Sequence, residues 1–398
     1  MRPAPLHWLT FLRYPATLWV ILKHCLHNFG DSNAIPESGR KAFMEHGFLG
    51  VPFFFILSGF ILAYNYPVIR SKADYLAARA GRILPVYYLS ILCSVPLMII
   101  LTHEHGLGFG LSRTFLYLTL TQAWFPNMHS FGNFPTWTLS CEVFFYALLV
   151  IMLIPLQRFI SGSPGRAALF ITGCFFFGLI APTIFYFNYG DPPAAAFDDV
   201  RNAGLISASN DVKIFVIWHL AEFFAGVALC IGVRSRLESL AKYAWLLIML
   251  GALQIASCFL FPIIFSQGTY CLPGFVLLIL GFAVLPFPDL KTASPLKKWL
   301  GSTAILLGNA SYSVYLFHVP FIAYLGMIGR HALPILPKGE AGVWTLYAET
   351  TVLATAFGLA VFYLYEQPCR ERVRAWLGPR LKWLDQPAPV TAGAQESA

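Results

Sequence analysis

Residues 12–30 read LRYPATLWVILKHCLHNFG, and this stretch decides the class of fold. Most of it is apolar enough to cross a bilayer, yet it holds Arg13, Lys23, His24 and His27. An arginine at the centre of a membrane helix costs roughly 2.5–3.5 kcal/mol on insertion scales. Arg13 and His24 are eleven residues apart, so they share one helix face within roughly 20° and lie about 16 Å apart along the axis.

Two interpretations of these polar residues are open. In the first, Arg13 and Lys23 extend to opposite interfaces and His24 is a satisfied interior polar group. In the second, they mark a functional site, which is the default meaning of ionisable residues inside a membrane. We favour the second, and His27, nearly on the same face, is a competing candidate.

The composition supports a membrane protein. Of 398 residues, 57% are hydrophobic and only 12% are charged, whereas soluble domains carry about 25% charged residues. The net charge of +8 is what the positive-inside rule produces, so we expect the lipid bilayer as a partner and no nucleic acid.

Ten apolar segments are long enough to span, and they predict an all-α, polytopic helical bundle with about ten transmembrane helices. They lie at about 8–27, 47–65, 84–102, 138–156, 166–187, 213–233, 241–265, 270–287, 304–327 and 345–366. A polar-interrupted run at 111–124 predicts an interfacial or re-entrant helix.

Basic residues give the orientation. With the N-terminus inside, 18 Lys and Arg residues face the cytoplasm, 7 lie outside and 2 lie within the first span. Both termini are therefore predicted to be cytoplasmic. We expect one transmembrane domain over 1–370 and a partly disordered tail over 371–398. The outer loops are expected at 103–137 and at 188–212, where Asp191, Asp198, Asp199 and Asp211 make the second acidic.

The eight cysteines form no CxxC pair, and most lie in apolar runs. They are interpreted as small hydrophobic residues, so neither a disulfide framework nor a metal site is expected.

The run RAGRILP places Arg79 and Arg82 just before the predicted third span, on one helix face. Two guanidiniums there make a fork for phosphate oxygens. The alternative is a positive-inside anchor among lipid headgroups.

The stretch FPTWTLSCEVFFY, residues 134–146, opens the fourth span. Glu142 falls about one turn below its outer end and needs a cationic partner, for which the first span is the candidate source. Trp137 is interpreted as part of the interfacial aromatic belt, and Thr138 and Ser140 as helix caps.

Three further runs carry polar residues. GFLGVPFFFILSGF, at 47–60, holds Ser58 among glycines that favour close helix packing. His219 and Glu222 are predicted to satisfy each other. LGNASYSVYLFHVPF, at 307–321, brings Tyr312 and His318, and YEQPCR, at 365–370, brings Glu366 to the end of the last span.

Taken in order, these motifs resemble the acyltransferase-3 family of integral-membrane, mostly bacterial enzymes that O-acylate sugars and other hydroxyl compounds. The resemblance runs from about residue 9 to 370. It implies ten core spans, an acyl-CoA donor (acetyl-CoA expected) and a carbohydrate or other hydroxyl acceptor. It also implies that His24 is the catalytic histidine with Arg13 as its companion, and that Arg79 and Arg82 bind the acyl-CoA. Glu142 matches the family's glutamate.

The resemblance thus implies a membrane O-acyltransferase, expected in the bacterial inner membrane, whose acceptor is a hydroxyl of a sugar, a cell-envelope polysaccharide or a related compound. His24 is either a general base or is itself acylated, and Glu142 is expected to fix its tautomer. The alternative is a transporter or flippase of a sugar-linked substrate. Many such proteins contain an internal inverted repeat, and the sequence does not display one.

Overall fold

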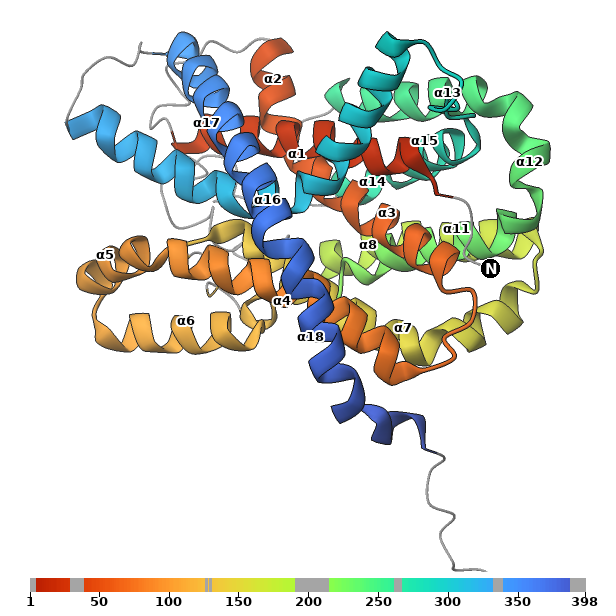
Figure 1. Ribbon diagram of the computed structural model, residues 1–398, viewed down its shortest axis with the longest axis horizontal. Coiled ribbons are helices and arrows are strands. Elements are labelled where there is room, and N and C mark those ends of the chain that lie inside the picture. Colours follow the sequence, from red (N-terminus) through yellow and green to blue (C-terminus); the bar gives the residue numbers. More distant parts are fainter. Residues whose placement is uncertain are drawn as a thin grey trace, which may run out of the picture.

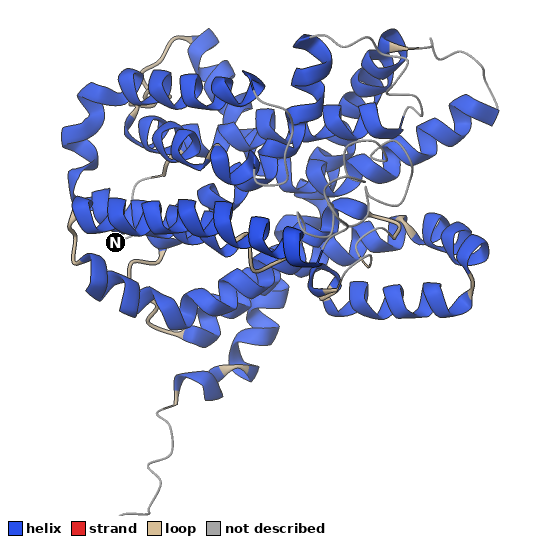
Figure 2. Cartoon of the chain, turned by 180° about the vertical axis from the view of Figure 1, so that it is seen from behind, coloured by secondary structure: helices blue, strands red, loops and turns tan. Residues whose placement is uncertain are grey.

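The computed structural model describes residues 5–28, 39–125, 128, 131–189, 215–260, 267–331 and 339–386. All regular elements of these residues are helices, which confirms the all-α prediction (Figure 2). The α-helices are α1 (His7–Asn28), α2 (Gly39–Glu45), α3 (Gly50–Asn65), α4 (Lys72–Cys93), α5 (Val95–His105), α6 (Leu107–Thr119), α7 (Trp137–Ile160), α8 (Pro164–Tyr189), α11 (Leu220–Val233), α12 (Leu237–Leu240), α13 (Ala244–Ser257), α14 (Gln267–Tyr270), α15 (Leu272–Val284), α16 (Pro295–His331), α17 (Glu340–Val361) and α18 (Gln367–Arg380). Short 3-10 turns cover His46–Leu49, Gln122–Trp124, Phe134–Thr136, Arg234–Arg236, Ala241–Tyr243, Cys258–Leu260 and Lys382–Asp385, and Phe362–Glu366 is π-helical.

The chain is a multi-pass membrane protein. Within the described residues, seven helical stretches are long and apolar enough to cross a bilayer. The count of about ten stays a prediction. Helices α1 and α15 are not among the seven, and α11 and α13 fall in one continuous 41-residue stretch.

Helix α1 lies at the centre of the bundle and packs against α3, α15, α16 and α17 (Figure 1). It continues through Pro15 without interruption. Ile21, Leu22, Cys25 and Leu26 are buried on one side of it, against residues of α16 and α17. The first apolar stretch therefore organises the neighbouring helices around it.

The third predicted span, 84–102, is wrong in its bounds. Helix α4 begins earlier, at Lys72, because the Ser71 hydroxyl accepts a hydrogen bond of 3.0 Å from the Asp74 amide and caps the helix. Arg79 and Arg82 therefore lie inside the helix instead of before it. The helix ends at Cys93, and α5 and α6 follow as a separate pair, so the predicted helix at 111–124 falls on α6 (Figure 1).

Glycines bring α3 and α11 into backbone contact. A Cβ atom on Gly59 would lie 2.0 Å from the carbonyl oxygen of Phe223, and one on Gly226 would lie 1.9 Å from that of Ile56. Only hydrogen fits at either position, so the packing interpretation of residues 47–60 is confirmed.

The remaining expectations concern the cysteines, the domain boundary, the acidic loop and the C-terminal tail. Cys258 and Cys271 form a disulfide, so the interpretation of all eight cysteines as small hydrophobic residues is wrong for this pair. The cysteines are thirteen residues apart, and Cys271 directly precedes α15, which packs against α13. The expected domain boundary at residue 370 falls inside α18. The four aspartates of the acidic loop and residues 387–398 of the tail lie outside the described residues.

Candidate active site

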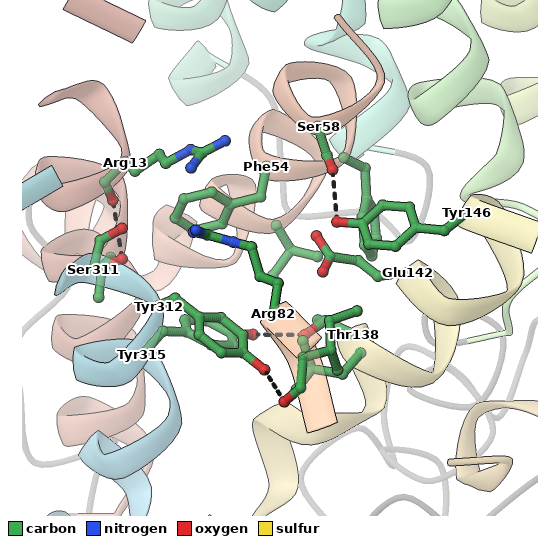
Figure 3. Close-up of a pocket in the computed structure, with 15 residues that line it drawn as sticks. Arg13, Phe54, Ser58, Arg82, Thr138, Glu142, Tyr146, Ser311, Tyr312 and Tyr315 are labelled. Atoms are coloured by element: carbon green, nitrogen blue, oxygen red, sulfur yellow. Dashed lines mark hydrogen bonds between the residues drawn. The ribbon is translucent and has the colours of Figure 1, made fainter. Parts of the chain in front are cut away.

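A cavity lies where α1, α3, α4, α7 and α16 meet (Figure 3). It holds about 700 Å³ of empty space, counted with its opening to solvent. Its lining consists of Arg13, Thr17, Val51, Phe54, Phe55, Ser58, Arg82, Ile83, Thr138, Leu139, Glu142, Tyr146, Ser311, Tyr312 and Tyr315. Five helices that are distant in sequence thus contribute to one site.

Three of the predicted site residues meet in this cavity: Arg13 from α1, Arg82 from α4 and Glu142 from α7 (Figure 3). Both guanidiniums act electrostatically on the Glu142 carboxylate. The cavity therefore carries two fixed positive charges and one negative charge. The expectation that Glu142 has a cationic neighbour from the first span agrees with this placement of Arg13.

Tyr146 connects Glu142 to α3. Its hydroxyl group lies 3.1 Å from the Ser58 hydroxyl, and its side chain acts on the Glu142 carboxylate one helical turn away. Sequence reasoning quoted Tyr146 only as part of a motif. The i, i+4 spacing from Glu142 was the signal that could have identified it.

Two tyrosines of α16 form an aromatic wall. The Tyr312 hydroxyl donates to the carbonyl oxygen of Ile83 at 2.9 Å, and the Arg82 guanidinium lies 5.8 Å from the centre of the Tyr312 ring. The Tyr315 hydroxyl lies 3.3 Å from that of Thr138 on α7. These contacts fix the wall against α4 and α7, so the cavity has a defined shape.

His24 does not line the cavity. Its ring lies 5.1 Å from that of His318 and 5.6 Å from that of Phe134, measured between ring centres. The residues one turn away, Tyr315 before His318 and Thr138 after Phe134, do line it. The two histidines therefore lie about one turn beyond the wall that Tyr315 and Thr138 form.

His318 is fully buried, and its surroundings define its protonation pattern. Its Nδ1 contacts the Tyr315 carbonyl oxygen, which can only accept, so Nδ1 carries the hydrogen. Nε2 has no hydrogen-bond partner among the described residues. It is therefore a proton acceptor next to His24. Within the described ranges, no group of three or more His, Cys, Asp or Glu side chains could hold a metal ion.

The structure does not bring Glu142 to His24, so the expected carboxylate–histidine pair is not formed. The groups that act electrostatically on His24 are His318, His27 and Lys23. Glu142 instead faces the arginines of the cavity, because it lies two turns after Phe134 on the α7 side of the wall.

The predicted arginine pair divides between two environments. Arg82 lines the cavity, whereas Arg79 donates to the Tyr66 hydroxyl at 3.2 Å. Glu366 is fully buried behind them. Its Oε1 lies 3.9 Å from Arg82 and 3.6 Å from Arg370.

Several interpretations of residues near the start of α7 change. Trp137 is 7% exposed and packs 5.3 Å from the His219 ring, so its assignment to the interfacial belt is wrong. Thr138 and Ser140 are not caps. Thr138 donates to the Pro135 carbonyl oxygen at 2.9 Å, and Ser140 accepts from a backbone amide of the preceding loop.

The pair on α11 is as predicted. His219 Nδ1 and the Glu222 carboxylate lie 2.8 Å apart. Neither side chain lines the cavity. The buried charge of Glu222 is thus satisfied locally, separately from the site.

Comparison with known proteins identifies the family of the chain. A family model described as an acyltransferase domain, Acyl_transf_3, matches residues 6–365. A Bacillus subtilis protein provisionally named a peptidoglycan O-acetyltransferase, YrhL, is 24% identical over 81% of this chain, which spans about half the length of that relative. No solved structure gives a significant match.

Two other relatives are matched over nearly their full length. The exopolysaccharide production protein ExoZ of Rhizobium meliloti is 27% identical over 83% of this chain and 91% of its own. The acyltransferase MdmB of Streptomyces mycarofaciens is 23% identical over 96% of this chain and 95% of its own. Because the family model covers nearly the whole chain, the protein belongs to the acyltransferase-3 family and is a membrane-embedded acyltransferase.

Proposed function

We propose that the protein transfers an acetyl group from acetyl-CoA to a hydroxyl group of a sugar, in a cell-envelope polysaccharide or a related acceptor. The observation that carries the proposal is the cavity itself. Arg13, Arg82 and Glu142 converge there from three helices, and His24 lies about one turn beyond its wall. The names of YrhL and ExoZ, a peptidoglycan O-acetyltransferase and an exopolysaccharide production protein, favour a polysaccharide acceptor.

The charge of the cavity suits an anionic donor. In this proposal the phosphates of acyl-CoA bind near Arg79 and Arg82, since guanidinium forks match phosphate oxygens. The thioester arm then extends through the cavity between Phe54 and the tyrosine wall. The acetyl group reaches His24 past the contact between Tyr315 and Thr138.

The reaction needs a base and a place for the developing oxyanion. The acceptor oxygen attacks the thioester carbonyl carbon while His24 takes the hydroxyl proton. The new C–O bond forms, the C–S bond breaks, and the coenzyme A thiolate takes the proton back from His24. In this scheme His318 stays neutral, with its Nδ1 hydrogen directed at the Tyr315 carbonyl oxygen.

The proposed setting is the bacterial inner membrane with both termini in the cytoplasm, which the excess of basic residues on one side supports. The donor is then available on the side where the C-terminal helix lies. A transporter or flippase, the alternative from sequence, is not favoured by a family and relatives that are acyltransferases.

Mass spectrometry of cell-envelope glycans tests the acceptor. We expect O-acetyl groups on at least one glycan to disappear when the gene is deleted and to return with the wild-type gene but not with His24→Ala. A His27→Ala gene at matched expression is the control and should restore them. Unchanged glycan acetylation in the deletion strain would contradict a glycan acceptor.

The donor site makes a second prediction. Arg79→Ala and Arg82→Ala should each weaken acyl-CoA binding by about 1.5–3 kcal/mol, since each removes charge-assisted hydrogen bonds. The measurement is calorimetric titration of the purified protein with acetyl-CoA. Arg236→Ala, which removes an exposed arginine, is the matched control. Equal donor affinity in all three variants would leave the pair as a membrane anchor.

A further inference from the structure

The segment just after the residues matched by the family model brings a third arginine, Arg370, close to Arg82 and Glu366. The match ends at residue 365, and Glu366 and Arg370 follow within the next turn and a half. Arg370 Nη2 lies 3.6 Å from Glu366 Oε1, and Arg82 Nη1 lies 3.9 Å from the same oxygen. The other oxygen of Glu366 accepts a hydrogen bond of 2.8 Å from Ser313.

This cluster has more cationic donors than anionic acceptors. Arg82 and Arg370 share the Glu366 carboxylate, and both Arg79 and Arg82 act electrostatically on Arg370. The distances to Glu366 Oε1 exceed those of hydrogen bonds, and this oxygen has no hydrogen-bond partner among the described residues. The buried Nε atoms of Arg79 and Arg370 have none there either.

The side chains of Arg82 and Arg370 are only 24% and 34% exposed and share one carboxylate. A charge that is partly removed from water favours an additional counter-charge, because burial of an uncompensated charge is unfavourable. With Arg13 and Glu142, to which they are electrostatically linked, these groups comprise four arginines and two glutamates, so two positive charges have no matching negative charge. An anion with at least two negative charges, such as a phosphate monoester or a diphosphate, would balance them and accept the free N–H groups.

The position of Arg370 is fixed by backbone packing. A Cβ atom on Gly81, between the two arginines of α4, would lie 2.6 Å from the Arg370 carbonyl oxygen. Beyond α18, the Asp385 carboxylate accepts hydrogen bonds from the Ser71 hydroxyl at 2.8 Å and the Lys72 amide at 2.7 Å. Helix α18 is thus held along α4 from its first turn to its end (Figure 1).

We propose that Arg370 is a third donor-binding residue, which completes with Arg79 and Arg82 a site for the phosphate groups of acyl-CoA. This inference rests on the proposed function, since it takes acyl-CoA as the donor. It extends the donor site from α4 to the C-terminal helix. A phosphate group of an anionic lipid has the same chemistry, so the experiment distinguishes the two sources.

The test is calorimetric titration of the purified full-length protein with coenzyme A. Arg370→Gln is compared with Arg372→Gln, which removes the same charge from an exposed position of the same helix. We expect Arg370→Gln to weaken coenzyme A binding about 10- to 100-fold and Arg372→Gln to bind like the wild type. Arg370→Lys, which keeps the charge but loses the fork, should lie between them.

One control measurement and three possible outcomes complete the test. Thermal unfolding of each variant in detergent checks that it is folded, and if Arg370→Gln is not, Arg370→Lys carries the comparison. Equal coenzyme A binding by the folded Arg370 and Arg372 variants would overturn this inference and leave the proposed function intact. A wild-type protein that does not bind coenzyme A would overturn both. If Arg370→Gln lost binding to phosphatidylglycerol nanodiscs but kept binding to coenzyme A, the cluster would be assigned to lipid and the inference would be overturned.

Discussion

Replacement of His24 by alanine is expected to lower the rate of acyl transfer by about 10²–10⁴-fold, the usual contribution of a general base. His27→Ala is expected to keep most of the activity. The two histidines differ in their surroundings. His24 is partly buried between Phe134 and His318, next to the cavity wall, whereas His27 is exposed in the last turn of α1.

The neighbouring histidine explains why His24 suits a base. His318 is fully buried, with its Nδ1 hydrogen directed at the Tyr315 carbonyl oxygen. Two adjacent imidazoles repel each other when both are protonated, which disfavours the charged form of each. The neutral imidazole is the form in which His24 can take a proton from the acceptor hydroxyl.

Acyl transfer by membranes with matched amounts of each variant, assayed with acetyl-CoA and the native acceptor, measures this effect. Retention of an acetyl-protein adduct by the wild type but not by His24→Ala would identify the acylated-histidine route instead of general-base catalysis. Full activity in His24→Ala, or its loss in His27→Ala, would contradict the assignment of His24.

The sequence was sufficient to predict the cavity's charged residues and a cationic neighbour of Glu142 from the first span. Helical periodicity put Arg13 and His24 on one face, and Arg13 does line the cavity. That Arg82 also acts on Glu142 was not predictable from spacing, because it depends on which helices pack against α7. Both Arg13 and His24 come from α1, but Arg13 lines the cavity, whereas His24 lies next to His318, one turn beyond Tyr315.

The boundaries of the membrane spans were harder to predict from the sequence than the charged residues of the cavity. The charged residues of the α4 segment lowered its apparent hydropathy, so the predicted span began at residue 84, twelve residues after the helix does. These charges are tolerated in the helix because Arg82 faces Glu366 and Arg79 faces Tyr66. The Cys258–Cys271 disulfide was likewise invisible in the spacing, since it forms only when α13 and α15 pack together.

Glu142→Gln is expected to destabilise the protein by about 1.5–3 kcal/mol and to impair acyl transfer. A neutral amide loses the charged interactions of the carboxylate with Tyr146, Arg82 and Arg13, and a hydrogen bond to a charged group typically contributes about that much. The substitution also removes the negative charge that lies between Arg13 and Arg82 in the cavity. The pH midpoint of the remaining activity should stay at the wild-type value, because Glu142 is not among the groups that act on His24.

A double-mutant cycle with Arg13→Gln tests this account of Glu142. If the carboxylate balances the cavity arginines, the double variant should be more stable than the two single effects predict, by about 0.5–3 kcal/mol. Glu222→Gln is the matched control, since Glu222 is a buried carboxylate with its own partner, His219. Thermal unfolding in detergent gives the stabilities. Additive effects of Glu142→Gln and Arg13→Gln, together with a shifted pH midpoint, would show that Glu142 acts on the histidine and not on the arginines.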